Sequence, residues 1–406
     1  MPTLTLISVS APYGPQEAFV VREFAALQEA GAHLQILPLR PSGPLYHGRA
    51  SQLAPVTEAL PLLHPQALLS ALYWLLQRPL CVASTLGILL AQSRTPLIAM
   101  KNLAVLPKAC WIATRAQRAG STHLHAQWAG TTTTAAWIAS RLTDLPYSFT
   151  AHRWDIGEDN LLATKVRTAA FARTSDGAGA VELAAKAGPG APTPWLLHLG
   201  VDLPPSPPTR PLPPVGQLRV LVPANLVPKK GHVVLFEALR DPALQGLDLH
   251  VTCAGDGPLR ASLEEALLER GLQARVTLAG MWPLERLHAE MASGRYDAVV
   301  LPSIVTSDGE TEGTPVSLVE ALAHGMPVLA SGIGGIPELL EDGCGLLVPP
   351  ADPAALAAGL ARLARDPDAA RAMAEAGLAR VSRDYEVEAV ARALLARIDR
   401  PSNRPA

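Results

Sequence analysis

The second half of the chain alternates short β-branched runs with helical patterns, which leaves few folds open. The runs predict six strands, at residues 218–222, 249–255, 276–280, 297–302, 327–331 and 345–349. Two of the intervening helices have clear starts, because Asp352-Pro353 and Asp366-Pro367 each place a capping carboxylate before a proline at the first helical position. This rhythm is typical of a parallel sheet with crossover helices.

The first half repeats the rhythm less clearly. It predicts strands near residues 3–9, 33–38, 122–126, 146–150 and 194–199. Between the halves lies PPSPPTRPLPP, with seven prolines in eleven residues, which predicts a stiff connection. The expected fold class is α/β, with two doubly wound Rossmann-like domains facing a central cleft. The expected parts are an N-terminal domain, a linker, a C-terminal domain, and a last helix and tail that could return to the first domain: 1–203, 204–216, 217–385 and 386–406.

Length and charge fit two domains. The 406 residues are 49% hydrophobic, which is enough to fill two cores. Residues 1–200 carry 15 Lys and Arg against 10 Asp and Glu, whereas residues 201–406 carry 19 against 26. The two halves are therefore expected to face different partners. With a net charge of −2 no nucleic-acid partner is expected.

Several classes of protein are disfavoured. The four cysteines are widely spaced and form no CxxC pair, so neither a metal knuckle nor a disulfide framework is expected. The chain opens without a basic segment or a cleavage site, so no signal peptide is expected. The apolar stretches 67–76 and 79–91 are each shorter than the roughly 20 residues that cross a bilayer. We expect a cytoplasmic protein that does not span a membrane.

The stretch SDGETEGTPVSLVEALAHGMPV, residues 307–328, carries two glutamates around a predicted helix start. A strand ends before it, a polar loop follows, and Pro315 begins a helix that stops at Gly325. Gly313 allows a ligand to approach the backbone. The first helical turn is expected to present free amides to a phosphate, those of Val316, Ser317 and Leu318.

The two carboxylates can serve a nucleotide sugar. Glu312 precedes the helix and Glu320 lies about five residues inside it, roughly 7 Å along the axis. A diphosphate with a sugar on one side and a ribose on the other spans a comparable distance. Glu312 could accept hydrogen bonds from the transferred sugar and Glu320 from the ribose. The alternative is a turn followed by a solvated helical glutamate.

This block resembles the nucleotide-sugar signature of retaining glycosyltransferase family 4, which has the two-lobed GT-B fold. The resemblance extends through LVPKKGHVVLFEAL (226–239), AGDGPLRASLEE (254–265), HLHAQWAG (123–130) and PYSFTAHRWDI (146–156). The opening PYGPQEAFVVREFAALQEAGAHL (12–34) is closer to the branch that builds bacterial exopolysaccharides of the colanic-acid type. The resemblance implies a glycosyltransferase that retains the anomeric configuration and uses no metal or other cofactor.

The resemblance also implies roles for individual residues. Lys230 would neutralise the leaving diphosphate, unless it is a solvated lysine like Lys229. His152 would reach the transferred sugar, unless it is structural. Three further residues are assigned weaker roles: Asp155 orients that loop or caps a helix, Arg153 supports the site, and Gly14 approaches the diphosphate.

Two histidines and one asparagine stand apart from this scheme. His123 and His125 lie on one face of a predicted strand and are expected to be structural rather than metal ligands. Asn225 occupies the position where the family usually has an arginine. It cannot neutralise charge. Three explanations are open. Lys229 supplies the missing positive charge, or an arginine of the first domain supplies it, either Arg22 or Arg153, or turnover is weak.

The expected function is transfer of a sugar from a nucleotide-diphosphate donor to a growing, lipid-linked cell-surface glycan. One alternative is a poorly active or non-catalytic nucleotide-sugar-binding subunit of a polysaccharide assembly complex. Another is a nucleotide-sugar epimerase or a phosphorylase on the same fold. Donor selectivity is expected to depend on contacts near Met281 and Trp282. Residues 60–118 are apolar and basic, which suggests either peripheral contact with an anionic membrane or ordinary core helices.

Overall fold

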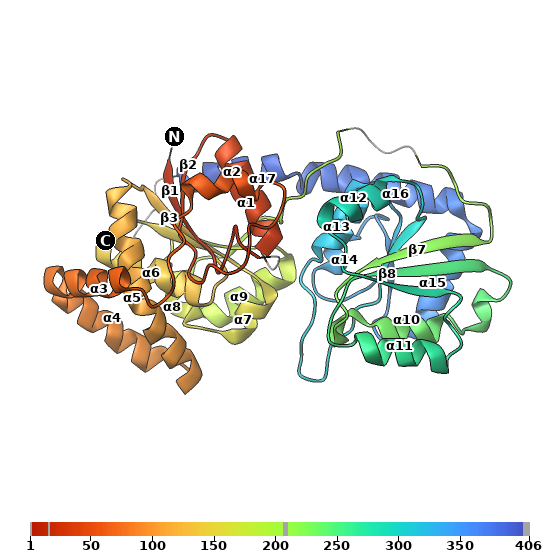
Figure 1. Ribbon diagram of the computed structural model, residues 1–406, viewed down its shortest axis with the longest axis horizontal. Coiled ribbons are helices and arrows are strands. Elements are labelled where there is room, and N and C mark those ends of the chain that lie inside the picture. Colours follow the sequence, from red (N-terminus) through yellow and green to blue (C-terminus); the bar gives the residue numbers. More distant parts are fainter. Residues whose placement is uncertain (1, 15–16, 206–209, 401–406) are drawn as a thin grey trace. The chain divides into compact units, whose positions relative to one another are not determined.

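The protein folds into two compact units (Figure 1). The computed structural model describes residues 2–14, 17–205 and 210–400. Unit 1 comprises Met1–Gly200 with Val387–Ala406, and unit 2 comprises Val201–Glu386. Residues 206–209 of the predicted linker, residues 15–16 and the tail 401–406 lie outside the described residues. The end of the linker lies on unit 2, where the Arg210 guanidinium donates to the Tyr296 carbonyl at 2.8 Å.

Unit 1 is built on a six-stranded parallel sheet in the order β2-β1-β3-β4-β5-β6. The strands are Thr3–Ile7, His33–Ile36, His123–Gln127, Tyr147–Ala151, Phe171–Thr174 and Trp195–Leu196, for β1 to β6. The chain leaves β1 on one side to form β2 and on the other to form β3. The switch point of this doubly wound sheet is therefore the gap between the ends of β1 and β3.

Helices cover both faces of this sheet. One face packs against α1 (Ala18–Glu29), α2 (Ala50–Leu53) and α17 (Val387–Ile398). The other packs against the remaining seven helices, which are α3 (Pro65–Gln77), α4 (Pro79–Gln92), α5 (Pro96–Arg118), α6 (Thr131–Thr143), α7 (Arg153–Glu158), α8 (Leu162–Thr168) and α9 (Gly177–Ala187). Because α17 packs on α1, the end of the chain completes the first core.

Strand β5, Phe-Ala-Arg-Thr, is not among the predicted strands, because an arginine in a four-residue run is not typical of a buried strand. Arg173 is nevertheless fully buried. Its guanidinium lies 2.6 Å from the Glu23 carboxylate and donates to the carbonyls of Leu197 and His198. A buried charge is tolerated when it is paired and hydrogen-bonded in this way.

The two readings left open for residues 60–118 depend on where the basic side chains of this segment lie. Lys108 is fully buried, its Nζ donates to the Leu60 carbonyl at 2.5 Å, and burial lowers its pKa to about 7. Most of the other basic side chains are paired with acids from outside this segment, as Arg78–Asp144, Arg94–Asp159, Lys101–Glu158 and Arg115–Glu58. Little unpaired positive charge therefore remains on these helices.

Helix α5, which the sequence analysis did not consider as a span, is long and apolar enough to cross a membrane by length and composition. Half of its apolar window is buried inside unit 1, and the helix packs against α3 and α6. This is the pattern of a core helix. The stretches that were considered form α3 and α4, two short helices that meet at a bend of 114°.

Unit 2 contains the six strands that the sequence predicts. They form a parallel sheet in the order β12-β11-β10-β7-β8-β9. The strands are Gln217–Pro223, Asp248–Ala254, Val276–Gly280, Ala298–Leu301, Val328–Ser331 and Leu346–Val348, for β7 to β12. The chain reverses its direction of growth between β7 and β10, so the switch point of this sheet lies where those two strands end.

Helices flank this sheet on both sides (Figure 1). On one side lie α10 (His232–Ala238), α11 (Arg260–Glu269) and α15 (Pro353–Arg365), and on the other α12 (Leu284–Ala292), α13 (Val316–Ala323) and α16 (Pro367–Asp384). The short α14 (Ile336–Leu339) follows β11. The two predicted caps are confirmed: Asp352 accepts from the Ala355 amide at 2.9 Å and Asp366 from the Ala369 amide at 3.0 Å.

Candidate functional site

The main candidate site lies in unit 2, at the carboxyl ends of β7 and β10. Residues 224–231 follow β7 and residues 302–315 follow β10. Neighbouring parallel strands whose connections leave in opposite directions open a crevice at this edge of the sheet. The loops that line it carry Asn225, Lys230 and Glu312, so residues that are far apart in the sequence meet at one place.

The first loop is held against the second by close backbone contacts. A short 3₁₀ turn, Pro228–Lys230, ends at Gly231, whose φ is +67°. A Cβ at this glycine would lie only 1.9 Å from the Pro302 carbonyl oxygen, so no other residue fits. The Ile304 amide donates to the Lys229 carbonyl at 2.8 Å. These contacts fix the end of the loop that carries Lys230.

Lys230 and Glu312 form an ion pair, with Nζ 2.7 Å from Oε1 and side chains 15% and 7% exposed. The Ser303 hydroxyl donates to the same carboxylate at 3.2 Å. From the loop after β11, Gly334 packs on the backbone of Glu312, and a Cβ there would lie 2.0 Å from the Glu312 carbonyl oxygen. Three loops therefore position one carboxylate. Neither Ser303 nor Gly334 was among the predicted site residues.

Helix α13 begins one residue later than predicted, with Pro315 as its N-cap. The expectation of three free amides is wrong for Leu318, because its amide donates to the Pro315 carbonyl at 3.0 Å. Val316 and Ser317 lie in the first turn and are half-buried. The helix start can therefore offer fewer donors to a phosphate than the sequence analysis expected.

Glu320 is buried on α13, with 4% of the residue exposed. Its Oε1 lies 3.5 Å from the His288 Nε2 of α12. The His288 ring in turn packs on the ring of His324, with 5.1 Å between their centroids. A buried carboxylate with histidine as a neighbour is not the solvated helical glutamate of the alternative reading. His288 carried no sequence signal, since a lone histidine on a helix has many structural uses.

Asn225 is exposed at the start of the first loop. The amide of Val227 donates to its carbonyl at 2.9 Å, which makes a tight turn. The neighbouring glycines are required there, because a Cβ at Gly255 would lie 1.9 Å from the Ala224 carbonyl and one at Gly257 would lie 2.5 Å from the Leu226 carbonyl. The turn thus places the uncharged side chain of Asn225 at the start of the loop that carries Lys230.

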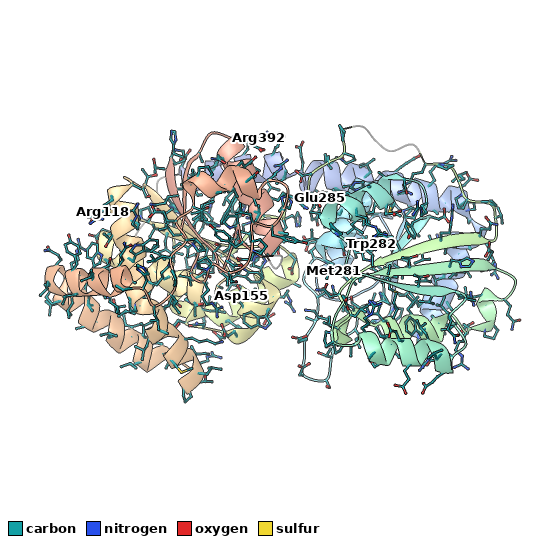
Figure 2. The ribbon with its side chains drawn as sticks, viewed as in Figure 1. Arg118, Asp155, Met281, Trp282, Glu285 and Arg392 are labelled. Carbon is teal, nitrogen blue, oxygen red and sulfur yellow. The ribbon has the colours of Figure 1, made fainter. Side chains whose placement is uncertain are left out.

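Two residues of unit 2, His232 and Trp282, bury polar ring atoms without a hydrogen-bond partner in the described chain, and of these two only His232 was not among the predicted residues. Among the described residues, neither ring nitrogen of His232 has a hydrogen-bond partner. Burial and the neighbouring charge of Lys230 lower its pKa to about 4. Trp282, labelled with Met281 in Figure 2, is 7% exposed, and its Nε1 also lacks a partner in the described chain. Met281 is 59% exposed.

Unit 1 carries a second group of candidates at its own switch point. Gly14 has φ +71°, and its amide donates to the Pro44 carbonyl at 3.0 Å. The Glu17 carboxylate accepts from the amides of Ser10 and Ala11 at 2.5 and 2.7 Å and from the Trp128 indole at 2.7 Å. Glu17 therefore holds together the loops that follow β1 and β3, a role that the sequence analysis did not assign.

His152 follows β4 and caps helix α7. Its amide donates to the Asp155 carboxylate at 2.7 Å, and the Ala129 amide donates to the other oxygen of that carboxylate. Asp155 (Figure 2) therefore both caps the helix and orients the loop, so the two readings left open apply together. Burial raises the pKa of Asp155 to about 7.

The His152 ring lies against aromatic side chains. Its centroid is 4.5 Å from that of Trp128 and 5.4 Å from that of Phe19. Burial, with a smaller contribution from the charge of Arg173, lowers the pKa of His152 to about 3. The imidazole is therefore neutral near pH 7 and can offer a hydrogen bond but no charge.

The remaining predicted residues of unit 1 have structural contacts. Arg153 lies 2.8 Å from the Glu182 carboxylate, and the Arg22 guanidinium is 3.4 Å from the Gly200 carbonyl. His123 and His125 both bond the Ser148 hydroxyl, at 2.7 and 2.8 Å, which accounts for their spacing without a metal. Within residues 2–14, 17–205 and 210–400, no cluster of three His, Cys, Asp or Glu could hold a metal ion.

Comparison with known proteins identifies the domain that carries the main site. Residues 209–380 match the family model for glycosyl transferases group 1. This stretch is a glycosyl transferases group 1 domain. It contains both glutamates, Lys230 and Asn225.

Relatives of the chain include the amylovoran biosynthesis glycosyltransferase AmsK of Erwinia amylovora, 42% identical over 149 residues. That match covers 36% of each chain. The putative colanic acid biosynthesis glycosyltransferase WcaL of Escherichia coli is 33% identical over 201 residues, 49% of each chain. The matched part thus spans at most about half of these relatives. Both names agree with the exopolysaccharide branch that the sequence resembles.

Solved structures show that the fold containing this glycosyltransferase domain is GT-B. Anabaena HepE in complex with UDP and glucose superposes with a TM-score of 0.69 at 17% identity, covering 99% of this chain and all of that one. Sucrose-phosphate synthase from Thermosynechococcus elongatus gives a TM-score of 0.68 at 21% identity and covers 98% of each chain. The predicted α/β class, with two doubly wound domains of the GT-B type, is therefore confirmed.

Proposed function

We propose that the protein is a glycosyltransferase that moves a sugar from a nucleotide-diphosphate donor to a growing exopolysaccharide. The observation that carries this proposal is the ion pair of Lys230 with the buried Glu312 at the switch point of a group 1 domain, with a second buried glutamate, Glu320, on the helix that follows. Relatives of the chain are named as amylovoran and putative colanic acid biosynthesis glycosyltransferases, and a protein of similar fold is bound to UDP and glucose.

The proposed roles of the residues follow from their charges. When the sugar leaves, negative charge develops on the β-phosphate and positive charge on the sugar, so the site must stabilise both. Lys230 supplies the positive charge, and the amides of Val316 and Ser317 add donors at the start of α13. Glu312 holds hydroxyls of the transferred sugar, and Glu320, buried beside His288, holds those of the ribose. Gly313 leaves room for the donor between the two glutamates.

Three finer features of the proposal come from the family resemblance. The anomeric configuration is retained, no metal or other cofactor takes part, and the acceptor is a lipid-linked glycan. Such an acceptor would bring a cytoplasmic enzyme to the membrane as a peripheral protein. His152 is assigned to the transferred sugar on the same basis, and its neutral ring suits a hydrogen bond to a hydroxyl.

Asn225 favours one alternative, a nucleotide-sugar-binding subunit with weak or no activity. The side chain is exposed and uncharged at the position where the family usually places an arginine. With Lys230 already paired to Glu312, the loops offer a diphosphate little net positive charge. Affinity and turnover therefore have to be measured separately.

The first experiment is a thermal-shift screen of the purified chain against UDP, GDP, ADP, TDP and their sugars. Ligands that bind the folded state raise its melting temperature. We expect one nucleotide class to stabilise the protein, and its sugar then to be consumed when a lipid-linked acceptor is added. NMR of the product would show the anomeric configuration. Absence of stabilisation by every nucleotide would reject the donor site, and conversion of the donor sugar without an acceptor would indicate an epimerase.

A further inference from the structure

Three helices of unit 1 expose an unusual number of large apolar side chains. Of the 23 large hydrophobic side chains that are exposed in the described chain, eleven lie on α3, α4 and the first half of α5. We call these the apolar helix surface: Leu68, Leu69, Leu72, Tyr73, Leu75, Leu76, Leu80, Leu90, Leu97, Met100 and Leu103. Several are more than half exposed, including Leu76 at 73% and Leu80 at 85%.

The exposure follows from helices that are apolar on more than one side. In α3 only Ala67 and Trp74 are buried, although most of its 13 residues are apolar. In α4 only Val82, Thr85 and Leu89 are buried among 14 residues. A helix that covers a sheet normally turns a polar face to water. A concentration of exposed apolar groups on neighbouring helices therefore marks an interaction surface.

The charges around this surface point to the class of partner. Between Glu58 and Asp144 the sequence contains no acidic residue but seven basic ones. Arg78 and Arg94 keep side chains 41% and 67% exposed while paired with Asp144 and Asp159, and Arg118 ends α5 (Figure 2). Helices that are apolar and carry no acidic residue of their own, with basic groups and a tyrosine among them, complement the interface of a phospholipid bilayer.

The geometry favours lying on a bilayer over crossing it. Helices α3 and α4 have 13 and 14 residues and meet at 114°, and each is shorter than the roughly 20 residues of a span. Helix α5 is half buried in the core of unit 1.

We infer that the apolar helix surface docks unit 1 on a phospholipid bilayer by insertion of its leucines. The driving force is burial of apolar side chains, because Lys108 is buried and the ion pairs have already used most of the positive charge. This differs from the electrostatic contact that composition alone suggested. The inference deepens the proposed function and rests on it only for the lipid-linked acceptor, because vesicle binding requires neither donor nor acceptor.

The test is flotation of the full chain with phosphatidylcholine vesicles, with and without phosphatidylglycerol, at about 0.1 M and about 0.5 M salt. The variant replaces three exposed leucines of α3 with glutamine, Leu69→Gln, Leu72→Gln and Leu76→Gln. The matched control replaces three exposed apolar residues elsewhere, Val181→Gln, Val233→Gln and Leu268→Gln. Circular dichroism and melting temperature confirm that both variants fold.

We expect the parent and the control to float with vesicles at both salt concentrations and the α3 variant to lose at least about ten-fold in partitioning. Three outcomes would overturn the inference: a parent that stays with the soluble fraction under every condition, equal binding by both variants, or binding that vanishes at the higher salt. Light scattering provides a fourth, since a parent dimer that the α3 variant converts to a monomer without vesicle binding would identify a self-association surface. Nucleotide binding, measured in the same samples, reports on the donor site independently.

Discussion

Lys230 and Glu312 neutralise each other across the crevice at the ends of β7 and β10, with 2.7 Å between Nζ and Oε1. The pair is largely removed from solvent, so its charges interact more strongly than those of a surface pair. A diphosphate that reaches Lys230 must compete with this carboxylate. The pair thus links donor binding to the position of the residue that we assign to the transferred sugar.

Removal of the Glu312 charge should separate binding from transfer. In Glu312→Gln the lysine loses its competing anion, so we expect UDP or the matching diphosphate to bind more tightly, by about 1 kcal/mol, while sugar transfer falls. Calorimetry and a transfer assay measure the two effects. Glu310→Gln, an exposed residue of the same loop, is the control and should change neither. Weaker diphosphate binding in Glu312→Gln would contradict the competition.

Glu320 should act on the ribose alone. We expect Glu320→Gln to weaken binding of the nucleoside diphosphate by about 1.5–3 kcal/mol, the usual contribution of hydrogen bonds to a charged group. Binding of inorganic pyrophosphate should be unaffected, because pyrophosphate has no ribose. Competition binding against a fluorescent nucleotide measures both. Equal losses for the two ligands would show that Glu320 acts through the shape of α13 instead.

Asn225→Arg should supply the charge that the first loop lacks. The side chain is exposed, so we expect diphosphate affinity to rise by only about 1 kcal/mol, with a matching rise in turnover if the leaving group limits it. Lys229→Gln in the parent tests whether Lys229 already supplies this positive charge. If Asn225→Arg changes nothing and Lys229→Gln abolishes binding, the compensation lies in Lys229.

Gly231 should be indispensable for the position of Lys230. Alanine at residue 231 combines a positive φ with a Cβ 1.9 Å from the Pro302 carbonyl, so the loop has to move. The matched control is Gly246→Ala, where φ is +77° but nothing lies within 4 Å. We expect the control to lose about 1–2 kcal/mol of stability from backbone strain alone, and Gly231→Ala to lose more together with nucleotide binding. Similar losses in the two variants would show that contact with Pro302 is unimportant.

Acid should destabilise unit 1 through His152. The folded-state pKa is lowered to about 3, whereas the unfolded side chain titrates near 6.5. Between these values the unfolded state binds the extra proton, so stability falls as pH falls, by about 1.4 kcal/mol per pH unit for this group. Melting curves from pH 7.5 to 4 should be flatter for His152→Gln than for the parent. His33→Gln, at an exposed histidine, should leave the slope unchanged.

The sequence by itself determined the architecture of unit 2 and the identity of its principal candidate residues. Strand alternation and the Asp-Pro caps are local signals, because the periodicity of a strand and the satisfaction of a helix N-terminus depend on neighbouring residues. The block from Glu312 to Glu320 is contiguous, so its resemblance to a nucleotide-sugar signature could be read without any contact. Lys230 and Gly231 lie in a second contiguous stretch, residues 226–239, which resembles the same family.

Only the tertiary structure decided how these pieces meet. The pairing of Lys230 with Glu312, and the packing of Gly334 on Glu312, join loops that follow three different strands. Strand β5 escaped the sequence reading because the charge of Arg173 is compensated by Glu23, which lies far away in the chain. Composition likewise could not tell the buried Lys108 from an exposed cation, or the exposed leucines of α3 from core residues. These cases share one physical reason. Burial and charge compensation depend on which distant segments pack together, whereas the local sequence around an apolar or charged side chain is the same whether that side chain is buried or exposed.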